Sequence, residues 1–445
     1  MSITLDRYID MVDEIEPLRV YGKVVEITGI IIKATGLRVS IGEACKIYGD
    51  NGMVIDAEVV GFKDGRVLLM AVGDLQWIKP GSPVYPAGRN LYVRVSEGLV
   101  GRIINALGRP IDGKGPVEGD IFPITGEMIN PLKRRRITEP LDLGIRAING
   151  LLTCGKGQRM GIIAGTGVGK SVLLGMIARY TEADVSIIGL IGERNREVRE
   201  FIERDLGEEG LKKSVVVVCT AQEPPLAKVR AAFTVTAIAE YFRNRLGRDV
   251  LLMVDSLTRV AMAQREIGLA VGEPPTTKGY TPSVFTLLPN LLERAGTASG
   301  SGSITGLYTV LVEGDDLADP IADAAMSVLD GHIILSRELA MAGQYPAIDV
   351  LRSVSRVMND IVDEKHRKLA MEFIEVLSTY RKYEDMISIG AYKEGSNRAV
   401  DRAIRMINKL RAYLRQSIND RRDMADSLHA LSLLFDEQEM KGDNR

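Results

Sequence analysis

The glycine-rich motif Ala164-Gly-Thr-Gly-Val-Gly-Lys-Ser171 constrains the fold of this chain more than any other feature. An apolar run, Gly161-Ile-Ile, precedes it, and a helix-forming run begins at Val172. A strand, such a loop and a helix in this order bind phosphate, because backbone N–H groups and a helix N-terminus converge on the phosphate oxygens. We expect Lys170 to bridge the β- and γ-phosphates of a nucleotide and Ser171 to ligate Mg²⁺. The other loop residues expected to bind the nucleotide are Gly165, Thr166, Gly167, Val168 and Gly169.

One position of this motif departs from the strict pattern. Ala164 stands where the pattern has glycine, and alanine fits there if its φ is negative. The alternative to a phosphate site is a structural turn with a surface lysine. The flanking strand and helix disfavour that alternative.

The region around the motif reads as an α/β domain. From Gly150 to about Arg356, apolar runs alternate with helical patterns. Near-continuous apolar strands separated by helices indicate a parallel sheet covered on both faces. The runs expected to be strands begin at Met160, Val185, Val215, Val250 and Tyr308.

The regions on either side of this domain have different sequence patterns. Residues 19–95 hold short β-branched runs separated by turn residues, with a hairpin expected at Asp64-Gly65, which predicts a small β-barrel. Beyond residue 356 the chain turns helical, and apolar side chains from Val400 to Leu414 form one stripe. We expect four parts: an amphipathic helix over 1–18, the β-barrel over 19–95, the α/β domain over 96–360 and a helical domain over 361–445.

Two basic groups leave alternatives open. Lys133-Arg134-Arg135-Arg136 could touch phosphate or lipid, but a solvated linker is the favoured interpretation. The polar side of the apolar stripe could meet an acidic partner, although a solvated face is favoured there too. The basic residues on that side are Arg398, Arg402, Arg405, Lys409, Arg411 and Arg415.

The composition excludes several functional classes. The chain has 445 residues, with 57 Lys and Arg against 59 Asp and Glu, a balance of −2 that argues against a protein that coats nucleic acid. No apolar run approaches the length of a membrane span, and the acidic N-terminus is not a secretory signal. The 3 scattered cysteines suggest a reducing cytosol, and the 3 histidines make a histidine-rich metal site improbable.

Two carboxylates are placed to assist phosphate chemistry. Asp255 ends the strand-like run Leu251-Leu-Met-Val and could hold Mg²⁺ through water. A helix N-cap is the plainer interpretation of such an aspartate. Glu193 follows another strand-like run and could activate the attacking water, or it could instead pair with Arg194 or Arg196.

A family resemblance covers nearly the whole chain. Motifs from the barrel to the C-terminus are similar to those of the flagellum-specific export ATPases, members of the rotary ATPase superfamily that are close to the injectisome ATPases. The matching segments are Asn130-Pro-Leu-Lys-Arg-Arg, the phosphate loop, Gly189-Leu-Ile-Gly-Glu-Arg, Val198-Arg-Glu-Phe-Ile-Glu, Asp255-Ser-Leu-Thr-Arg, Gly279-Tyr-Thr-Pro-Ser-Val-Phe, Glu313-Gly-Asp-Asp, Asp330-Gly-His-Ile and Tyr345-Pro-Ala-Ile-Asp.

The resemblance implies roles that spacing alone leaves open. Glu193 matches the glutamate that activates water in catalytic subunits, and Arg194 matches an adjacent phosphate-site arginine. Arg356 matches the arginine that enters a neighbouring subunit's site; without the resemblance, a structural ion pair would be the favoured interpretation. Tyr345 matches an aromatic residue that packs against adenine, with core packing as its alternative. Arg259 and Asp315 also match motif positions, without an assigned role. Asn195 stands where a small residue is usual.

The function that the resemblance implies is Mg²⁺-dependent ATP hydrolysis by a homohexamer with a RecA-like core, which drives or gates flagellar protein export. Expected partners are a stator or negative-regulator protein at the N-terminal helix, export gate proteins, chaperones and substrates, with no nucleic acid. The alternative for the N-terminal helix is that it packs on its own barrel. The expected location is cytoplasmic, peripheral at the inner face of the membrane. Alternatives are an injectisome ATPase, an ATP synthase subunit and an RNA translocase; the last is disfavoured by neutral charge and by a barrel without an aromatic RNA-binding signature.

Overall fold

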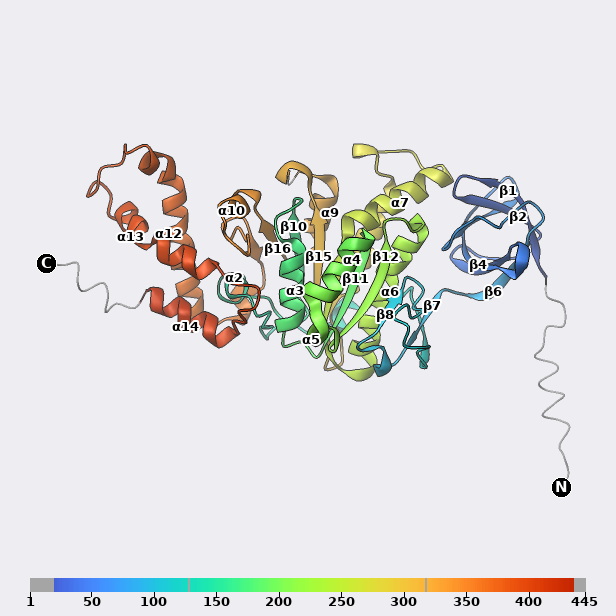
Figure 1. The fold of residues 1–445 in the computed structure, drawn as a ribbon, viewed down its shortest axis with the longest axis horizontal. Coiled ribbons are helices and arrows are strands. Elements are labelled where there is room, and N and C mark those ends of the chain that lie inside the picture. Colours follow the sequence, from blue (N-terminus) through green and yellow to red (C-terminus); the bar gives the residue numbers. More distant parts are fainter. Residues whose placement is uncertain (1–19, 127–128, 317, 436–445) are drawn as a thin grey trace, which may run out of the picture.

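The computed structural model describes residues 20–126, 129–316 and 318–435. Within these ranges the chain runs from a β-barrel through a central α/β domain to a group of C-terminal helices, and the three parts lie in a row (Figure 1). The amphipathic helix expected over residues 1–18 lies outside the described residues. None of the described helices is both long enough and apolar enough to cross a membrane.

The barrel is a closed antiparallel sheet in the order β1-β2-β5-β4-β3-β6. The expected hairpin is present, because Lys63 of β4 pairs with Arg66 of β5 across Asp64 and Gly65. Both turn residues have positive φ, 50° and 71°, as a two-residue hairpin of this twist requires. The barrel strands are β1 (Gly22–Thr28), β2 (Ile31–Thr35), β3 (Glu43–Tyr48), β4 (Val54–Lys63), β5 (Arg66–Ala71) and β6 (Pro83–Asn90).

The central sheet has the order β17-β16-β10-β15-β13-β11-β12-β8, and β14 pairs with β15. Its pairs are parallel except at β14 and β17, which confirms the predicted parallel sheet. All five runs expected to be strands are strands. The sheet consists of β8 (Ile103–Asn105), β10 (Arg159–Ala164), β11 (Val185–Glu193), β12 (Ser214–Thr220), β13 (Asp249–Asp255), β14 (Gly296–Thr297), β15 (Ser303–Leu311), β16 (Gly331–Leu335) and β17 (Val354–Ser355).

Helices cover both faces of this sheet, and a small ribbon of β7 (Tyr92–Val95) and β9 (Asp120–Pro123) lies beside it. The helices of this domain are α2 (Arg146–Leu151), α3 (Lys170–Tyr180), α4 (Asn195–Glu200), a π-helical turn (Phe201–Leu206), α5 (Gly207–Leu211), α6 (Pro225–Leu246), α7 (Leu257–Val271), α8 (Pro282–Leu292), α9 (Pro320–Val328), α10 (Arg337–Met341) and α11 (Met358–Ile361). Short 3₁₀ turns span Asp50–Gly52, Glu97–Leu99, Pro131–Lys133, Thr277–Gly279 and Glu313–Asp315.

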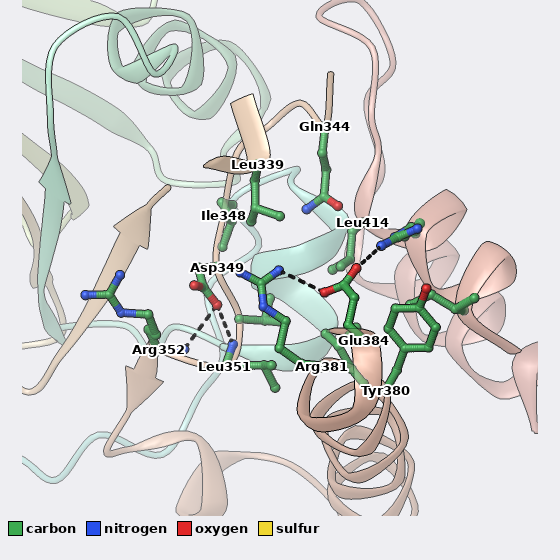
Figure 2. A pocket seen from close by; sticks show the side chains of 14 residues that line it. Leu339, Gln344, Ile348, Asp349, Leu351, Arg352, Tyr380, Arg381, Glu384 and Leu414 are labelled. Atoms are coloured by element: carbon green, nitrogen blue, oxygen red, sulfur yellow. Dashed lines mark hydrogen bonds and ion pairs between the residues drawn. The ribbon is translucent and has the colours of Figure 1, made fainter. Parts of the chain in front are cut away.

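The C-terminal part consists of α12 (Glu364–Ser388), α13 (Arg398–Leu414) and α14 (Met424–Leu434). The predicted apolar stripe of α13 faces inward, although Ile404 is only half-buried. A cavity of about 250 Å³ lies between α12, α13 and the segment from Leu339 to Arg352. Figure 2 draws the side chains that line it.

The polar side of α13 is not simply a solvated face. Arg402 pairs with Glu372 of α12, and Arg411 lies 3.0 Å from Glu384 of the same helix. The sequence could not reveal these partners because they lie on another helix, 30 and 27 residues away. The solvated-face interpretation is therefore wrong for these two arginines.

The basic cluster before the sheet is also not a free linker. The Arg134 guanidinium donates to the carbonyl oxygens of Ala295 and Glu293, and Arg135 donates to Ser301 at 2.5 Å. These arginines fix the backbone around β14, about 160 residues away in the chain. The predicted solvated linker is wrong for Arg134 and Arg135, because local charge density gave no sign of distant carbonyl acceptors, whereas Lys133 and Arg136 are exposed.

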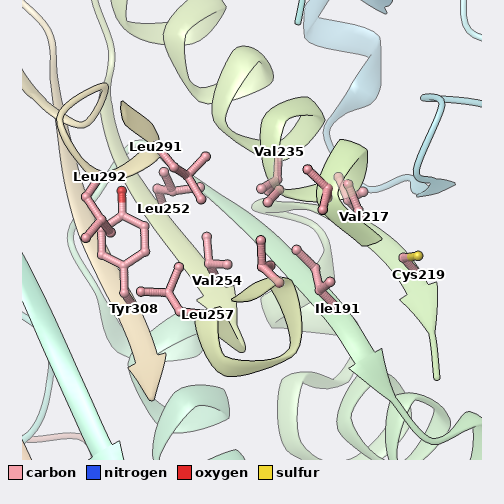
Figure 3. Close-up of a cluster of buried hydrophobic side chains, with 14 of the residues drawn as sticks. Ile191, Val217, Cys219, Val235, Leu252, Val254, Leu257, Leu291, Leu292 and Tyr308 are labelled. Carbon is pink, nitrogen blue, oxygen red and sulfur yellow. The ribbon is translucent and has the colours of Figure 1, made fainter. Parts of the chain in front are cut away.

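Successive side chains of the sheet strands point to opposite faces and build two cores. Val250, Leu252 and Val254 of β13 join the core under α6, α7 and α8 (Figure 3), whereas Leu251 and Met253 join the core on the α3 side. The first core extends into the barrel through Leu68 and Met70, and the second extends into the C-terminal helices. Continuous apolar packing thus joins all three parts of the described chain.

Candidate active site

The phosphate loop lies at the carboxyl end of β10, where a parallel sheet opens toward its ligands. Ala164 is the last residue of that strand and has no positive φ, so alanine fits there as expected. Gly167 and Gly169 have φ values of 79° and 85°, which side chains other than glycine's rarely allow. Lys170 then begins α3, and Ser171 follows in its first turn.

Three charged side chains meet beneath this loop. The Lys170 ammonium contacts the Asp255 carboxylate and lies 3.3 Å from Glu193 Oε1. Asp255 ends β13, Glu193 ends β11, and these strands are adjacent in the sheet. The structure therefore brings together three side chains that the sequence separates by as many as 85 residues.

The sequence did not predict one polar partner of this cluster, Thr309. The Thr309 hydroxyl donates to Asp255 Oδ1 at 2.7 Å, and Thr309 lies on β15, between the strands that carry the phosphate loop and Asp255. Asp255 is only 3% exposed, so this bond fixes the direction of its carboxylate. A buried threonine within the apolar run Tyr308-Thr-Val-Leu was the available signal.

Burial and charge shift the proton affinities of this cluster. Burial raises the pKa of Glu193 to about 7; Lys170 opposes the shift, while the Asp255 charge and a hydrogen bond with Glu197 add to it. Burial alone would lower the pKa of Lys170, but the carboxylates of Asp255 and Glu193 outweigh it and raise that pKa. Glu193 is thus poised to change protonation near neutral pH, as a general base requires.

The arginines predicted for this region lie at its edge. Arg194 is the N-cap of α4, and its mostly exposed side chain lies 3.7 Å from Glu197. Arg259 packs over Gly192, where an added Cβ would lie 2.7 Å from the Arg259 side chain. Within the described residues, the buried Arg259 Nε has no hydrogen-bond acceptor. The Arg259 side chain thus packs against the end of β11, and Arg194 follows Glu193 at the start of α4.

Tyr345 borders the phosphate loop from the other side. A Cβ added at Gly169 would lie 3.5 Å from the Tyr345 ring, so the ring lies against the loop. The ring is about half exposed (48%), which leaves a face open to a flat ligand. Gln344 and Ile348, on the same chain segment, line the cavity of Figure 2.

Arg356 lies away from its own phosphate loop. It follows β17, which pairs with the start of β16, and its backbone N–H donates to Asp330 at 3.0 Å. Asp330 is level with Arg159, at the start of β10, whereas the loop follows Ala164 at the end of that strand. At about 3.3 Å per residue the separation along the sheet is roughly 15 Å. Arg356 therefore cannot complete the site of its own chain in this conformation.

Comparison with known proteins places this geometry in a family. Residues 24–88 match the ATP synthase alpha/beta family beta-barrel domain, residues 144–355 match the nucleotide-binding domain of that family, and residues 362–432 match the T3SS EscN ATPase C-terminal domain. The chain is 53% identical to the "Flagellum-specific ATP synthase" of Bacillus subtilis, over 97% of this chain and 99% of that protein. The chain belongs to the ATP synthase alpha/beta family.

Other members of the ATP synthase alpha/beta family are similarly close. A "Type 3 secretion system ATPase" of Xanthomonas euvesicatoria is 49% identical over 94% of this chain and 95% of that protein. The solved structure of the assembled ATPase EscN from enteropathogenic E. coli has a TM-score of 0.87 and 43% identity, over 93% of this chain and 99% of that chain. These matches confirm the predicted fold class of the chain and its resemblance to flagellum-specific export ATPases.

Proposed function

We propose that the chain is the ATPase of a flagellar type III protein export apparatus. The observation that carries the proposal is the contact of Lys170 with Asp255 and Glu193 under a phosphate loop. The chain is an ATP hydrolase of the type III export class, since its relatives are export ATPases along their full length. The match at residues 362–432 favours export over ATP synthesis, because that C-terminal domain is described for export ATPases.

The donor set suits Mg²⁺ held jointly with ATP. Ser171 and Asp255 supply one hydroxyl and one carboxylate, and the described residues contain no cluster of three or more His, Cys, Asp or Glu side chains that could cage a metal alone. Mg²⁺ is commonly bound in this way, through one or two protein groups together with phosphates and water. Bound there, the ion would neutralise charge on the β- and γ-phosphates.

Side chains and loop N–H groups of the site carry out nucleotide binding and the activation of water. Lys170 binds the β- and γ-phosphates and leaves its carboxylate partners when they arrive. Glu193 accepts a proton from the attacking water, for which a pKa of about 7 is well matched. The loop residues Gly165 to Gly169 donate backbone N–H groups to the phosphates, and the Tyr345 ring packs against adenine.

Arg356 completes the site of a neighbouring subunit in a homohexamer. Its distance from its own loop supports this role, because an arginine at the opposite end of the sheet cannot reach phosphates bound in its own chain. A guanidinium group supplied in trans stabilises charge on the transferred phosphoryl group, an effect of roughly 10³–10⁵ in rate in other systems. Arg194 lies at the edge of the site and would approach the phosphate once its pairing with Glu197 is released.

Partners and location follow from the export role. We infer binding of a stator or negative-regulator protein at residues 1–18, and contacts with export gate proteins, chaperones and substrates. One relative was solved "in complex with its central stalk EscO", which supports a stalk protein as a further partner. We infer a cytoplasmic enzyme, peripheral at the inner face of the membrane, that does not act on nucleic acid.

The experiment is complementation of a flagellar ATPase deletion strain with the wild-type gene or with Glu193→Gln. We expect wild type to restore motility and export, and the variant to bind ATP while hydrolysis falls by about 10²–10⁴. Failure of the wild-type gene in the flagellar strain, with success in an injectisome ATPase deletion strain, would favour the second candidate, an injectisome ATPase. Full hydrolysis by Glu193→Gln would contradict the assignment of the base.

A further inference from the structure

One short connection ties the C-terminal helices to the segment that carries Tyr345 and to the far end of α3, the helix that follows the phosphate loop. The α13–α14 linker, residues 415–423, contacts the Tyr345 backbone on one side: the Gln416 N–H donates to the Tyr345 carbonyl at 2.9 Å. On the other side, the Tyr180 hydroxyl at the end of α3 donates to the Ile418 carbonyl at 2.7 Å. Because α3 begins at the phosphate loop, the linker bridges the loop helix and the segment that carries Tyr345.

The Gln416 side chain fixes this linker in place. It is only 6% exposed, and its Oε1 accepts from the Arg146 backbone N–H at 2.8 Å. Its Nε2 donates to the Gly144 carbonyl at 2.8 Å and to the Asp420 carbonyl at 2.6 Å. A buried carboxamide with both ends bonded has one stable orientation. Its main-chain N–H therefore meets Tyr345 at a fixed position.

The Tyr345 ring has an open side, while the backbone on either side of it is held by hydrogen bonds from Gln344 to Leu339 and from Ser336 to Ala347. The ring lies against Gly169, which has no side chain, and is about half exposed. The bond from Gln416 therefore supplies a fixed point for the backbone behind the ring. Loss of the carboxamide would free the linker, and the ring would lose the position in which it meets a base.

We propose that Gln416 is a positioning residue for nucleotide binding, which holds Tyr345 against the base through the α13–α14 linker. The proposal rests on the proposed role of Tyr345. It adds that the C-terminal helices tune the affinity for ATP without touching the phosphates. Movement of α13 and α14 on a partner would then change the Michaelis constant more than the turnover number.

The chain offers a matched control, Asn149. Its buried carboxamide also makes three hydrogen bonds, one of which reaches the linker: it accepts from the Leu143 N–H, and it donates to Asp142 and to the Arg422 carbonyl. Its contact is at the far end of the linker, six residues beyond Gln416, and it does not touch Tyr345. Asn149→Ala thus removes comparable bonds without releasing the point that holds the ring.

The test is kcat and KM for ATP of the assembled full-length enzyme in five forms: wild type, Tyr345→Ala, Gln416→Ala, the double variant and Asn149→Ala. We expect Tyr345→Ala to raise KM about tenfold, because base stacking is lost. Gln416→Ala raises KM about fivefold, the equivalent of one net hydrogen bond, with kcat within about twofold. The double variant matches Tyr345→Ala alone, because Gln416 acts through Tyr345. Asn149→Ala lowers Tm and leaves KM within about twofold.

Several results would overturn the proposal. An unchanged KM in Gln416→Ala, while Tyr345→Ala raises it, removes the positioning role and leaves the base pocket standing. An unchanged KM in Tyr345→Ala would contradict both the binding of adenine at Tyr345 and the positioning role of Gln416. An equal rise in Asn149→Ala would show a general loss of stability instead. If Gln416→Ala does not fold, Gln416→Glu keeps the acceptor for Arg146 N–H, loses both donors and is expected to give an intermediate KM.

Discussion

At the scale of single residues, the site contains more negatively charged side chains than positively charged ones. One ammonium, Lys170, meets two carboxylates, Asp255 and Glu193, in a partly buried space. Asp255 has a second donor in Thr309, whereas a hydrogen bond with Glu197 helps to raise the pKa of Glu193. Burial and the charge of Asp255 therefore make Glu193 the carboxylate of this cluster that takes up a proton near pH 7, as its proposed role as the base requires.

This charge distribution predicts a pH dependence of hydrolysis. Glu193 works as a base only when deprotonated, and its pKa is raised to about 7. The kcat/KM for ATP should therefore fall about tenfold per pH unit below 7 and level off above it, because this ratio reports groups of the free enzyme. The measurement is kcat/KM between pH 5.5 and 9, with the chain's fold checked at each pH.

Glu197→Gln provides the control for that profile. A hydrogen bond with Glu197 contributes to the raised pKa of Glu193, so its loss should move the midpoint to lower pH. A midpoint that does not move, or a flat wild-type profile, would contradict the assignment of Glu193 as the titrating base.

The sequence predicted most of this cluster and missed part of it. Lys170 was predictable from the phosphate loop, and Glu193 and Asp255 from their places after apolar runs. Thr309 was not, because a threonine inside a strand is ordinary until the neighbouring strand is known. The hydrogen bonds of Arg134 and Arg135 could not be predicted for the same reason, since their carbonyl acceptors lie far away in the chain.

At the scale of elements, the phosphate loop depends on glycines with positive φ. Gly169→Ala adds a Cβ at a φ of 85° and places it 3.5 Å from the Tyr345 ring. We expect a loss of about 1–2 kcal/mol in the free energy of unfolding, from backbone strain, and weaker ATP binding. Urea unfolding and KM for ATP check the two effects.

Gly272→Ala is the matched control for that change. Gly272 caps α7 with a φ of 97°, and an added Cβ would meet nothing within 4 Å. Its alanine variant should lose similar stability and keep the wild-type KM for ATP. Equal changes in KM for the two variants would show that the effect on binding is not local to the loop.

The strands were predictable because buried parallel strands read as continuous apolar runs. The hairpin at Asp64-Gly65 was predictable because its turn demands positive φ at both residues. The pairing of Arg402 and Arg411 with α12 was not, since the packing of helices decides which surface charges meet. The local sequence pattern thus predicts the helices and strands, whereas long-range packing determines which residues their polar side chains contact.

The barrel joins the central domain through a buried ion pair between β4 and α6. Glu58 is only 3% exposed and pairs with Arg230; burial raises the pKa of Glu58, and Arg230 opposes that shift. Arg230→Met leaves this carboxylate unpaired and should cost about 3–5 kcal/mol in the free energy of unfolding. The cost should grow as pH rises, because the ionised form is the one left without a partner.

The double variant Glu58→Met/Arg230→Met should regain most of that loss, since apolar side chains can replace a buried pair. Urea unfolding of the three proteins at two pH values measures both effects. No loss in Arg230→Met, or no recovery in the double variant, would show that the pair does not join the barrel to α6.

At the scale of the whole molecule, we propose that each chain carries two halves of different active sites. Lys170, Glu193 and Asp255 meet at one end of the sheet, and Arg356 lies near the other end. In a ring, the second half of one chain can face the first half of the next. A single chain should therefore hydrolyse ATP slowly, and the specific activity should rise with protein concentration as rings form. Equal rates for monomer and hexamer would contradict the role of Arg356.

The most direct test of this account mixes two inactive proteins. Glu193→Gln and Arg356→Ala are each expected to be nearly inactive alone. In mixed hexamers, an intact Glu193 from one variant can meet an intact Arg356 from the other at roughly a quarter of the interfaces. The account predicts that ATPase activity reappears on mixing, in proportion to those restored interfaces. A mixture that forms rings and stays as inactive as its components would contradict catalysis shared between neighbouring subunits.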